Sequence, residues 1–291
     1  MSTTQHLQLV ECPRDAMQGW PQMIPAFQKV AYINALLHVG FHTIDFGSFV
    51  SPKAIPQMAD TKEVLEALDL SATRSGLLGI VANTRGAEEA VVYDSIRSLG
   101  FPFSVSETFQ RRNTNSTIEH SFQTVEEIQR LCEKKGKELV IYLSMGFGNP
   151  YDDPWSEEIV LDWAEKIAAL GVPVISLADT VGLASPEQIS RLTSTLIEAL
   201  PAVQIGVHLH AKADNRTEKL EAAFNAGCRR FDGALKGIGG CPMAGDVLVG
   251  NMDTAFIISY LESRGIETGI HKGALQKSIL LAKEVFSPVV L

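Results

Sequence analysis

The chain has 291 residues, a formal net charge of -9, 45% hydrophobic residues and 20% charged residues. This apolar content can bury a large core, which excludes an intrinsically disordered protein. The acidic total argues against a nucleic-acid partner, because a nucleic-acid-binding surface needs a basic patch.

The first residues and the cysteines indicate a cytoplasmic protein. Residues 1–5 lack the basic and apolar regions of a secretory signal, and no apolar run approaches the roughly 18 residues of a membrane span. The four cysteines form no CxxC pair and are too few for a disulfide framework. We therefore expect a soluble protein with reduced thiols and no membrane partner.

Short runs rich in Val, Ile and Leu alternate along the chain with segments of helical periodicity. The predicted strands are residues 7–12, 42–46, 77–82, 101–106, 139–145, 172–177, 205–210 and 230–235. The predicted helices between them are residues 24–39, 62–68, 87–99, 117–135, 157–170, 186–200 and 217–226. Ser116 and Glu119 fit a capping box, and Ser185 followed by Pro186 fits an N-cap with proline at the first helical position.

About eight strand–helix units predict an α/β fold of the (β/α)8 TIM-barrel type. A doubly wound sheet is the competing architecture, but no GxGxxG loop follows the first strand. Residues 270–291 predict a further helix. We expect a single domain over residues 1–291, with a barrel core at 1–268 and a C-terminal helical extension at 269–291.

In such a barrel the chemistry lies where strands end. His208 and His210 are two residues apart on a predicted strand, so both imidazoles point to one face. Asp15 after the first strand could add a carboxylate oxygen and Asn251 an amide oxygen. This mixed set suits Mg²⁺ or Mn²⁺, and Zn²⁺ is also compatible. The alternative is a pair of barrel-lining histidines satisfied by hydrogen bonds.

Other polar residues near strand ends have both a functional and a structural interpretation. Arg14 could stabilise developing negative charge on a carbonyl oxygen, or form a surface ion pair with Asp15. Cys241 lies in a glycine-rich loop and could transfer a proton on loop closure, although a single cysteine is more often inert. Asp179 could contact the histidines or substrate, or cap a turn. Asn83 follows a strand and could line a polar mouth.

Taken together, these motifs resemble those of hydroxymethylglutaryl-CoA lyases, over nearly the full chain. The opening motif spans residues 12–18 (CPRDAMQ), and residues 48–53 (SFVSPK) match a segment of the lyase branch. Residues 179–182 (DTVG), 237–242 (GIGGCP) and 250–251 (GN) resemble three further family segments.

The resemblance implies Asp15, His208, His210 and Asn251 as ligands of a divalent metal. It implies Arg14 as the cation that stabilises an enolate and Cys241 as a residue in proton transfer. The reaction would be retro-Claisen cleavage of 3-hydroxy-3-methylglutaryl-CoA to acetyl-CoA and acetoacetate.

We add Asp45 and Asp179 to the catalytic candidates. The candidate substrate-binding residues are Gln18, Ser48, Lys53 and Asn83.

Several positions depart from the family pattern. Asp45 stands where these lyases usually have Glu, Ala211 and Lys212 replace Asp-Thr, and Asn149 replaces a cysteine. The reaction class is therefore better supported than the exact acyl-CoA. The alternatives are a related aldolase or Claisen-type acyltransferase, or a non-catalytic barrel that binds acyl-CoA. We expect an acyl-CoA as the small-molecule partner, and we keep a homodimer as an option.

Overall fold

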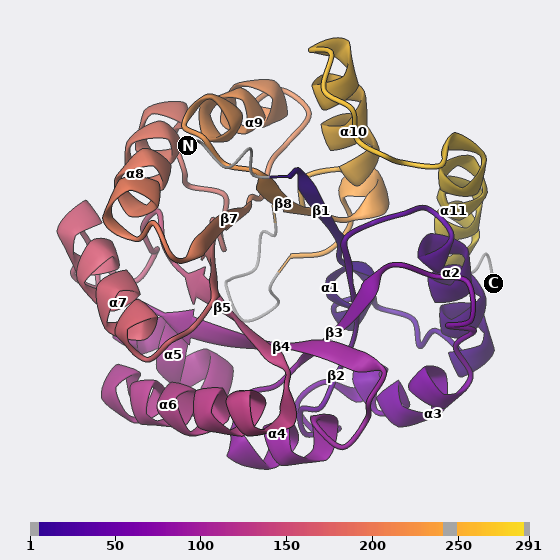
Figure 1. The fold of residues 1–291 in the computed structure, drawn as a ribbon, viewed down its shortest axis with the longest axis horizontal. Helices are drawn as coiled ribbons and strands as arrows, with labels where there is room; N and C mark the ends of the chain where they lie inside the picture. The colour runs from indigo at the N-terminus through magenta and orange to yellow at the C-terminus, as the bar shows by residue number, and fades with distance from the viewer. Residues whose placement is uncertain (1–5, 241–248, 288–291) are drawn as a thin grey trace.

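Eight parallel strands pair in chain order, and β8 returns to β1 to close a barrel (Figure 1). The computed structural model describes residues 6–240 and 249–287. The strands are β1 (Gln8–Glu11), β2 (Thr43–Ser48), β3 (Gly76–Ile80), β4 (Ile96–Ser104), β5 (Glu138–Ser144), β6 (Val174–Ala178), β7 (Gln204–His208) and β8 (Arg230–Gly233). The predicted TIM barrel is confirmed.

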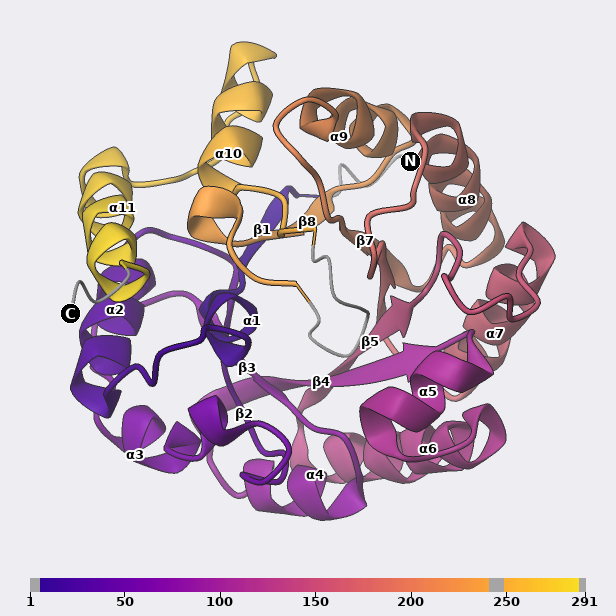
Figure 2. The same cartoon turned by 180° about the vertical axis from the view of Figure 1, so that it is seen from behind.

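Helices surround this barrel, and the short α1 lies inside their ring next to β1, as both views show (Figures 1 and 2). They are α1 (Pro13–Gln18), α2 (Ala26–Leu37), α3 (Thr61–Glu66), α4 (Thr84–Ala90), α5 (Glu107–Thr114), α6 (Ile118–Lys135), α7 (Glu157–Ala169), α8 (Pro186–Ala199), α9 (Arg216–Asn225), α10 (Thr254–Ser263) and α11 (Lys272–Val285). Two 3₁₀ turns are η1 (Pro56–Met58) and η2 (Leu235–Gly237). Among the residues described, no helix is both long and apolar enough to cross a membrane.

The strands are buried on both faces, as expected of a parallel sheet covered by helices. One large apolar core lies between the barrel and its helices. A smaller cluster consists of Leu78, Ile80, Val140, Tyr142 and Val174. Its members alternate along β3, β5 and β6, so they share the inner face of the barrel.

Two local predictions are wrong. Residues 87–99 do not form one helix, because α4 ends at Ala90 and β4 already begins at Ile96. The N-cap of α6 is Thr117, whose side chain accepts a hydrogen bond from the His120 amide, so the predicted capping box at Ser116 does not form. The capping box at Ser185 does form, with Gln188 as its reciprocal partner.

The end of the chain returns to its beginning, since α11 packs beside α2 (Figure 1). The ring of Phe286, which directly follows α11, meets Trp20 edge-on with the ring centroids 5.3 Å apart, and it also meets Tyr32 at 6.0 Å. The predicted extra helix therefore exists and covers the N-terminal part of the barrel. A domain limit between residues 268 and 269 stays a prediction.

Candidate active site

Arg14 and Asp15 lie in α1, a single short helix that begins directly after β1. Pro13 occupies its first position, where a missing N–H costs no hydrogen bond. The helix turns the side chains of Arg14 and Asp15 toward the end of the barrel instead of leaving them on a loop. Both side chains are about nine-tenths buried.

Arg14 is held by a set of charge-assisted hydrogen bonds. Its Nε donates to both carboxylate oxygens of Asp45, at 3.1 and 3.0 Å, and its Nη2 donates to Oδ2 of Asp45 at 2.6 Å. Its Nη1 donates to Asp15 Oδ1 at 3.1 Å and to Gln18 Oε1 at 2.8 Å. Gln18 closes the ring by donating to Asp15 Oδ1 at 3.0 Å. The guanidinium is therefore fixed in one orientation.

Burial and charge shift these carboxyl groups in opposite directions. Burial raises the pKa of Asp45 to about 6, although the Arg14 charge opposes the rise. Burial also acts to raise the pKa of Asp15, but the charges of Arg14, His208 and His210 outweigh it, and the pKa of Asp15 falls to about 2. Asp15 therefore stays a carboxylate at neutral pH, whereas Asp45 can change protonation near neutrality.

The structure brings His208 and His210 together with Asp15. One ligand atom from each of these side chains lies within 4.8 Å of the others, and all three residues are buried. β7 ends at His208, so His210 lies just beyond the strand, where an isolated bridge pairs it with Asn251. The two imidazole centroids are 5.3 Å apart. The chain thus places two nitrogens and a carboxylate around one point.

Asn251 joins this cluster through its amide nitrogen. Nδ2 donates to Asp15 Oδ2 at 2.7 Å and to the Ile238 carbonyl at 2.8 Å. Its Oδ1 is buried and, within residues 6–240 and 249–287, has no hydrogen-bond partner. A buried acceptor without a donor is costly, so this oxygen fits a metal ligand. Together the four residues offer nitrogen and oxygen donors of the kind that Mg²⁺, Mn²⁺ and Zn²⁺ accept.

Asp179 faces away from this cluster and forms a buried ion pair. Lys219 Nζ donates to Asp179 Oδ2 at 2.6 Å and to the His210 carbonyl at 2.9 Å. The other oxygen of Asp179 accepts from the Ala184 amide at 3.0 Å. Burial raises the pKa of Asp179 against the opposing charge of Lys219. Asp179 therefore supports the backbone at His210 through Lys219, and the structure does not show it contacting either imidazole.

A cavity of about 430 Å³ opens over the site. Its wall includes Arg14, Asp15, Gln18, His208 and His210, whereas Asp45 lies behind Arg14 and is 1% exposed. Other strands, the loops that follow them and helix α5 also contribute to the wall, which includes Ile80, Asn83, Phe109, Arg112, Tyr142, Ser144 and Thr180. The cavity therefore exposes the cationic Arg14 and three of the four proposed ligands, Asp15, His208 and His210, to one small molecule.

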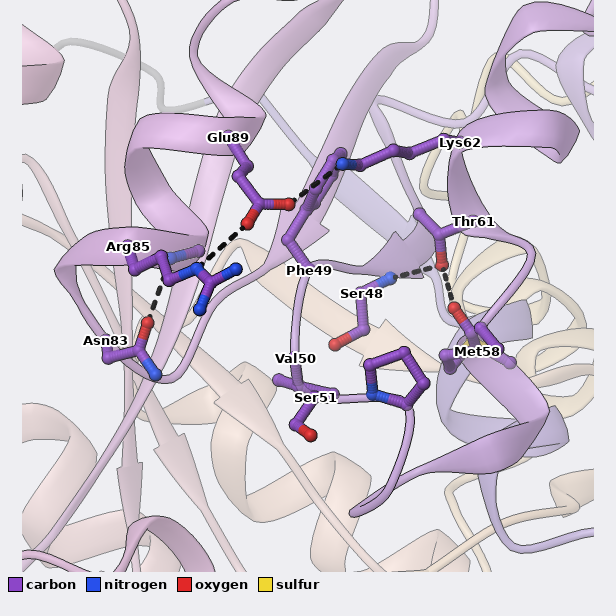
Figure 3. A pocket seen from close by; sticks show the side chains of 13 residues that line it. Ser48, Phe49, Val50, Ser51, Met58, Thr61, Lys62, Asn83, Arg85 and Glu89 are labelled. Carbon is purple, nitrogen blue, oxygen red and sulfur yellow. Dashed lines mark hydrogen bonds and ion pairs between the residues drawn. The ribbon is translucent and has the colours of Figure 1, made fainter.

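A second cavity of about 390 Å³ lies beside it, between the segment after β2 and helix α4 (Figure 3). Ser48 and Asn83 line this second cavity, and Asn83 also borders the first. Asn83 caps α4 by accepting from the Gly86 amide at 2.9 Å, and the Ser48 hydroxyl donates to the Ile80 carbonyl at 3.4 Å. Glu89 binds Lys62 at 2.9 Å and Arg85 at 3.4 Å, so neither cation is free of a partner.

Two of the remaining predicted residues fall elsewhere. The side chain of Lys53 is exposed and does not line either of these two cavities. Cys241, the candidate for proton transfer, lies outside the described residues.

The sequence patterns missed Asp232 and Lys219. Asp232 lies 3.5 Å from His208 Nδ1, and Lys219 binds Asp179. A signal for the first was available, because Arg230 and Asp232 alternate in a strand otherwise expected to be apolar. The helical position of Lys219 carried no comparable signal.

Comparison with known proteins gives one consistent family. The sequence model of the HMGL-like family matches residues 7–279. A hydroxymethylglutaryl-CoA lyase of Bacillus subtilis is 32% identical over 273 residues, which cover 93% of this chain and 89% of the relative. An (R)-citramalyl-CoA lyase of Chloroflexus aurantiacus is 32% identical, with coverage of 90% and 85%.

A solved structure shows the same likeness in three dimensions. An HMG-CoA lyase from Acinetobacter baumannii, in complex with coenzyme A and 3-methylmalate, superposes with a TM-score of 0.90 at 32% identity. The match covers 98% of this chain and 93% of that one. The resemblance noted in the sequence motifs is confirmed, and the chain belongs to the HMGL-like family.

Proposed function

We propose that this protein is a divalent-metal-dependent carbon–carbon lyase that cleaves 3-hydroxy-3-methylglutaryl-CoA to acetyl-CoA and acetoacetate. The observation that carries the proposal is the fixed Arg14 beside Asp15, His208 and His210 on the wall of one cavity. Membership of the HMGL-like family and the coenzyme A bound to a relative support an acyl-CoA substrate.

The reaction makes three chemical demands. The tertiary hydroxyl must lose its proton and become the ketone of acetoacetate. The adjacent C–C bond must break, and its electron pair must pass into the thioester to form an enolate. The enolate carbon must then take up a proton to give acetyl-CoA. Stabilising the charge on the enolate oxygen is the largest of these demands.

Arg14 meets the demand for positive charge. It lines the cavity while Asp45 fixes two of its guanidinium nitrogens from behind. Because this orientation exists before substrate arrives, little reorganisation is needed when charge develops. A pKa of about 6 lets Asp45 be ionised at neutral pH, so the ion pair is complete under those conditions.

Asp15, His208, His210 and Asn251 are the residues that would hold the metal, with Mg²⁺ or Mn²⁺ favoured and Zn²⁺ as the third candidate. A bound divalent cation would polarise substrate oxygens and ease loss of the hydroxyl proton. Gln18 holds the side chains of Asp15 and Arg14 in a fixed relative orientation, because it forms a hydrogen bond with each of them. Cys241 keeps its proposed role in returning a proton, and Ser48 and Asn83 keep theirs in binding substrate.

The test is a thioester cleavage assay on metal-stripped protein. Addition of Mg²⁺ or Mn²⁺ with 3-hydroxy-3-methylglutaryl-CoA should release acetoacetate and acetyl-CoA, and EDTA should stop the release. Absence of product with Mg²⁺, Mn²⁺ and Zn²⁺ alike would refute this substrate. Tight metal retention without turnover of any thioester would instead favour the non-catalytic barrel.

A second substrate follows from the similarity to an (R)-citramalyl-CoA lyase, which is as high as that to the Bacillus subtilis enzyme. The two thioesters differ by one methylene between the tertiary carbon and its carboxylate, and one methylene is worth roughly 1–3 kcal/mol of discrimination in a fitted pocket. Including citramalyl-CoA in the assay, with pyruvate as product, decides between them by the ratio of kcat/KM. An aldolase or acyltransferase activity is not favoured, since both relatives are named lyases.

We also propose a cytoplasmic location, and we keep the homodimer as an assembly to be tested by light scattering on the purified protein.

A further inference from the structure

Asp232 occupies the inner face of the barrel beside a proposed metal ligand. In the β7–β8 pairing, His208 is directly opposite Asp232. The carboxylate side chain is fully buried, and its Oδ2 lies 3.5 Å from His208 Nδ1. The same imidazole also belongs to the cluster with Asp15 and His210.

The surroundings of Asp232 leave its carboxylate without a full set of donors. Both oxygens are buried and, in the described part of the chain, lack a hydrogen-bond partner within normal length. The nearest cation is Arg230, whose Nε is 3.9 Å from Oδ1 and is itself unpartnered. A buried carboxylate needs a donor to offset its desolvation, and His208 Nδ1 is the closest candidate.

His208 is also restrained in its ring plane. Tyr142 meets the imidazole edge-on, with the ring centroids 5.8 Å apart and the planes at 83°. If Nδ1 carries a proton directed at Asp232, the lone pair of Nε2 is the one free to bind a metal. A carboxylate in this place fixes the tautomer of a metal-binding histidine and increases its basicity.

We propose that Asp232 is a positioning residue, which holds His208 in the Nδ1–H tautomer so that Nε2 can bind the divalent metal. His210 differs, since the described residues place no carboxylate other than that of Asp15 in its ligand cluster, and its hydrogen-bond contact is with the Val249 backbone. The inference depends on the proposed metal site and goes beyond it, because it assigns a function to a residue that is not a ligand.

Mn²⁺ alone is the probe, titrated into the metal-stripped full-length protein by calorimetry. Asp232→Asn should weaken Mn²⁺ binding about 10–100-fold, the usual cost of losing such a partner. Asp232→Glu, which keeps the charge, should recover part of the affinity. Ser176→Ala is the matched control, because Ser176 is a fully buried and unpartnered hydroxyl on β6 whose register partner on β7 is Gly206, not His208. It should leave Mn²⁺ affinity within about twofold of the parent.

The outcomes separate this inference from the metal site itself. If the parent does not bind Mn²⁺, the metal site is wrong. If the parent binds and Asp232→Asn binds equally well, only the positioning role is wrong. If Cys12→Ser weakens Mn²⁺ binding as much as Asp232→Asn does, the metal lies in the deeper cluster of Cys12, His208 and Asp232, and Asp232 is a ligand.

A measurement on the unaltered chain covers the case in which Asp232→Asn fails to fold. Long-range ¹H–¹⁵N spectra report which ring nitrogen of a histidine carries the proton. The signals of His208 can be assigned by their loss in His208→Gln. An Nδ1–H tautomer in the metal-stripped protein, retained on binding Zn²⁺ as a diamagnetic probe, is expected. An Nε2–H tautomer would overturn the proposal.

Discussion

On the β1–β2 side of the site, Arg14, Asp15, Gln18 and Asp45 bind one another through hydrogen bonds of 2.6–3.1 Å. On the β7–β8 side, buried atoms of His208, His210, Asp232 and Asn251 lack partners among the described residues. The first side is complete without a ligand, whereas the second offers donors that a cation would satisfy. Under the proposed function, charge stabilisation is preorganised on the first side, and a metal would complete the second.

Removing the cation from the complete side should have the largest effect. Arg14→Met keeps most of the side-chain volume but loses the charge at the cavity wall, so we expect kcat to fall at least about 10²–10³-fold. Mn²⁺ affinity should change much less, because Arg14 is not a proposed ligand. Asp15→Ala is the contrasting variant and should lose Mn²⁺ binding as well as activity. Normal turnover by Arg14→Met would show that the enolate charge is stabilised elsewhere.

Glu11, a fully buried residue of β1, connects the first strand to the segments that follow the last one. Its carboxyl group accepts from the Leu235 amide at 2.9 Å and from the Thr254 hydroxyl at 2.5 Å, and so ties β1 to the segments after β8. Burial raises the pKa of Glu11 to about 8, against the lowering effect of these hydrogen bonds. The folded protein therefore binds a proton that the unfolded chain releases above its ordinary pKa of 4.5.

Glu11 therefore contributes to the free energy of unfolding. This contribution is fully present below about pH 4.5 and is lost as the pH rises to about 8. The loss attributable to Glu11 is roughly 3–5 kcal/mol in the free energy of unfolding. Glu11→Gln, which keeps the shape without the charge, should flatten the dependence in urea titrations at pH 5, 7 and 9. An equal slope in parent and variant would place the proton elsewhere.

The barrel was predictable because each helix–strand unit repeats the same apolar pattern. α1 was not, because its six residues are too short for a periodic signal, even though Pro13 marks its start. Likewise, Ile96 and Leu99 fit either a helix or a strand, and only pairing with β3 and β5 decides. Short apolar runs leave this choice to tertiary contacts.

Site residues at strand ends could be found by one topological rule, which brought Asp15, His208 and His210 to the same place. Asp232 could not, since its contact with His208 depends on the register between β7 and β8. The same rule misplaced Asp179. Its position after β6 predicted a side chain at the open end of the barrel, but that side chain binds Lys219 instead.

A subtler test of the preorganised side concerns pH. Asp45 should be ionised above its pKa of about 6 and protonated below it, so the ion pair between Asp45 and Arg14 weakens as the pH falls. We expect kcat/KM to decrease below about pH 6, roughly tenfold for each further unit. Asp45→Asn should remove this limb of the pH profile, and Asp45→Glu, the residue usual in these lyases, should restore it. If the decrease of kcat/KM below about pH 6 persists in Asp45→Asn, a group other than Asp45 causes it.

The smallest effect should come from replacing Lys53. Comparing this variant with one at Arg112 shows whether the acyl-CoA is bound by a cation on the surface or by one in the cavity. Lys53 is exposed, whereas Arg112 lines the main cavity and lies over the ring of Tyr151 at 4.7 Å. An exposed cation contributes roughly 0–1 kcal/mol to an ionic contact. Lys53→Ala should therefore raise KM for the acyl-CoA by less than about fivefold, and added salt should abolish the difference. Arg112→Ala should raise KM more and keep the increase in salt. If Lys53→Ala has the larger effect, the anionic part of the substrate binds outside the cavity, and a net charge of -9 would then coexist with an anion site on the surface.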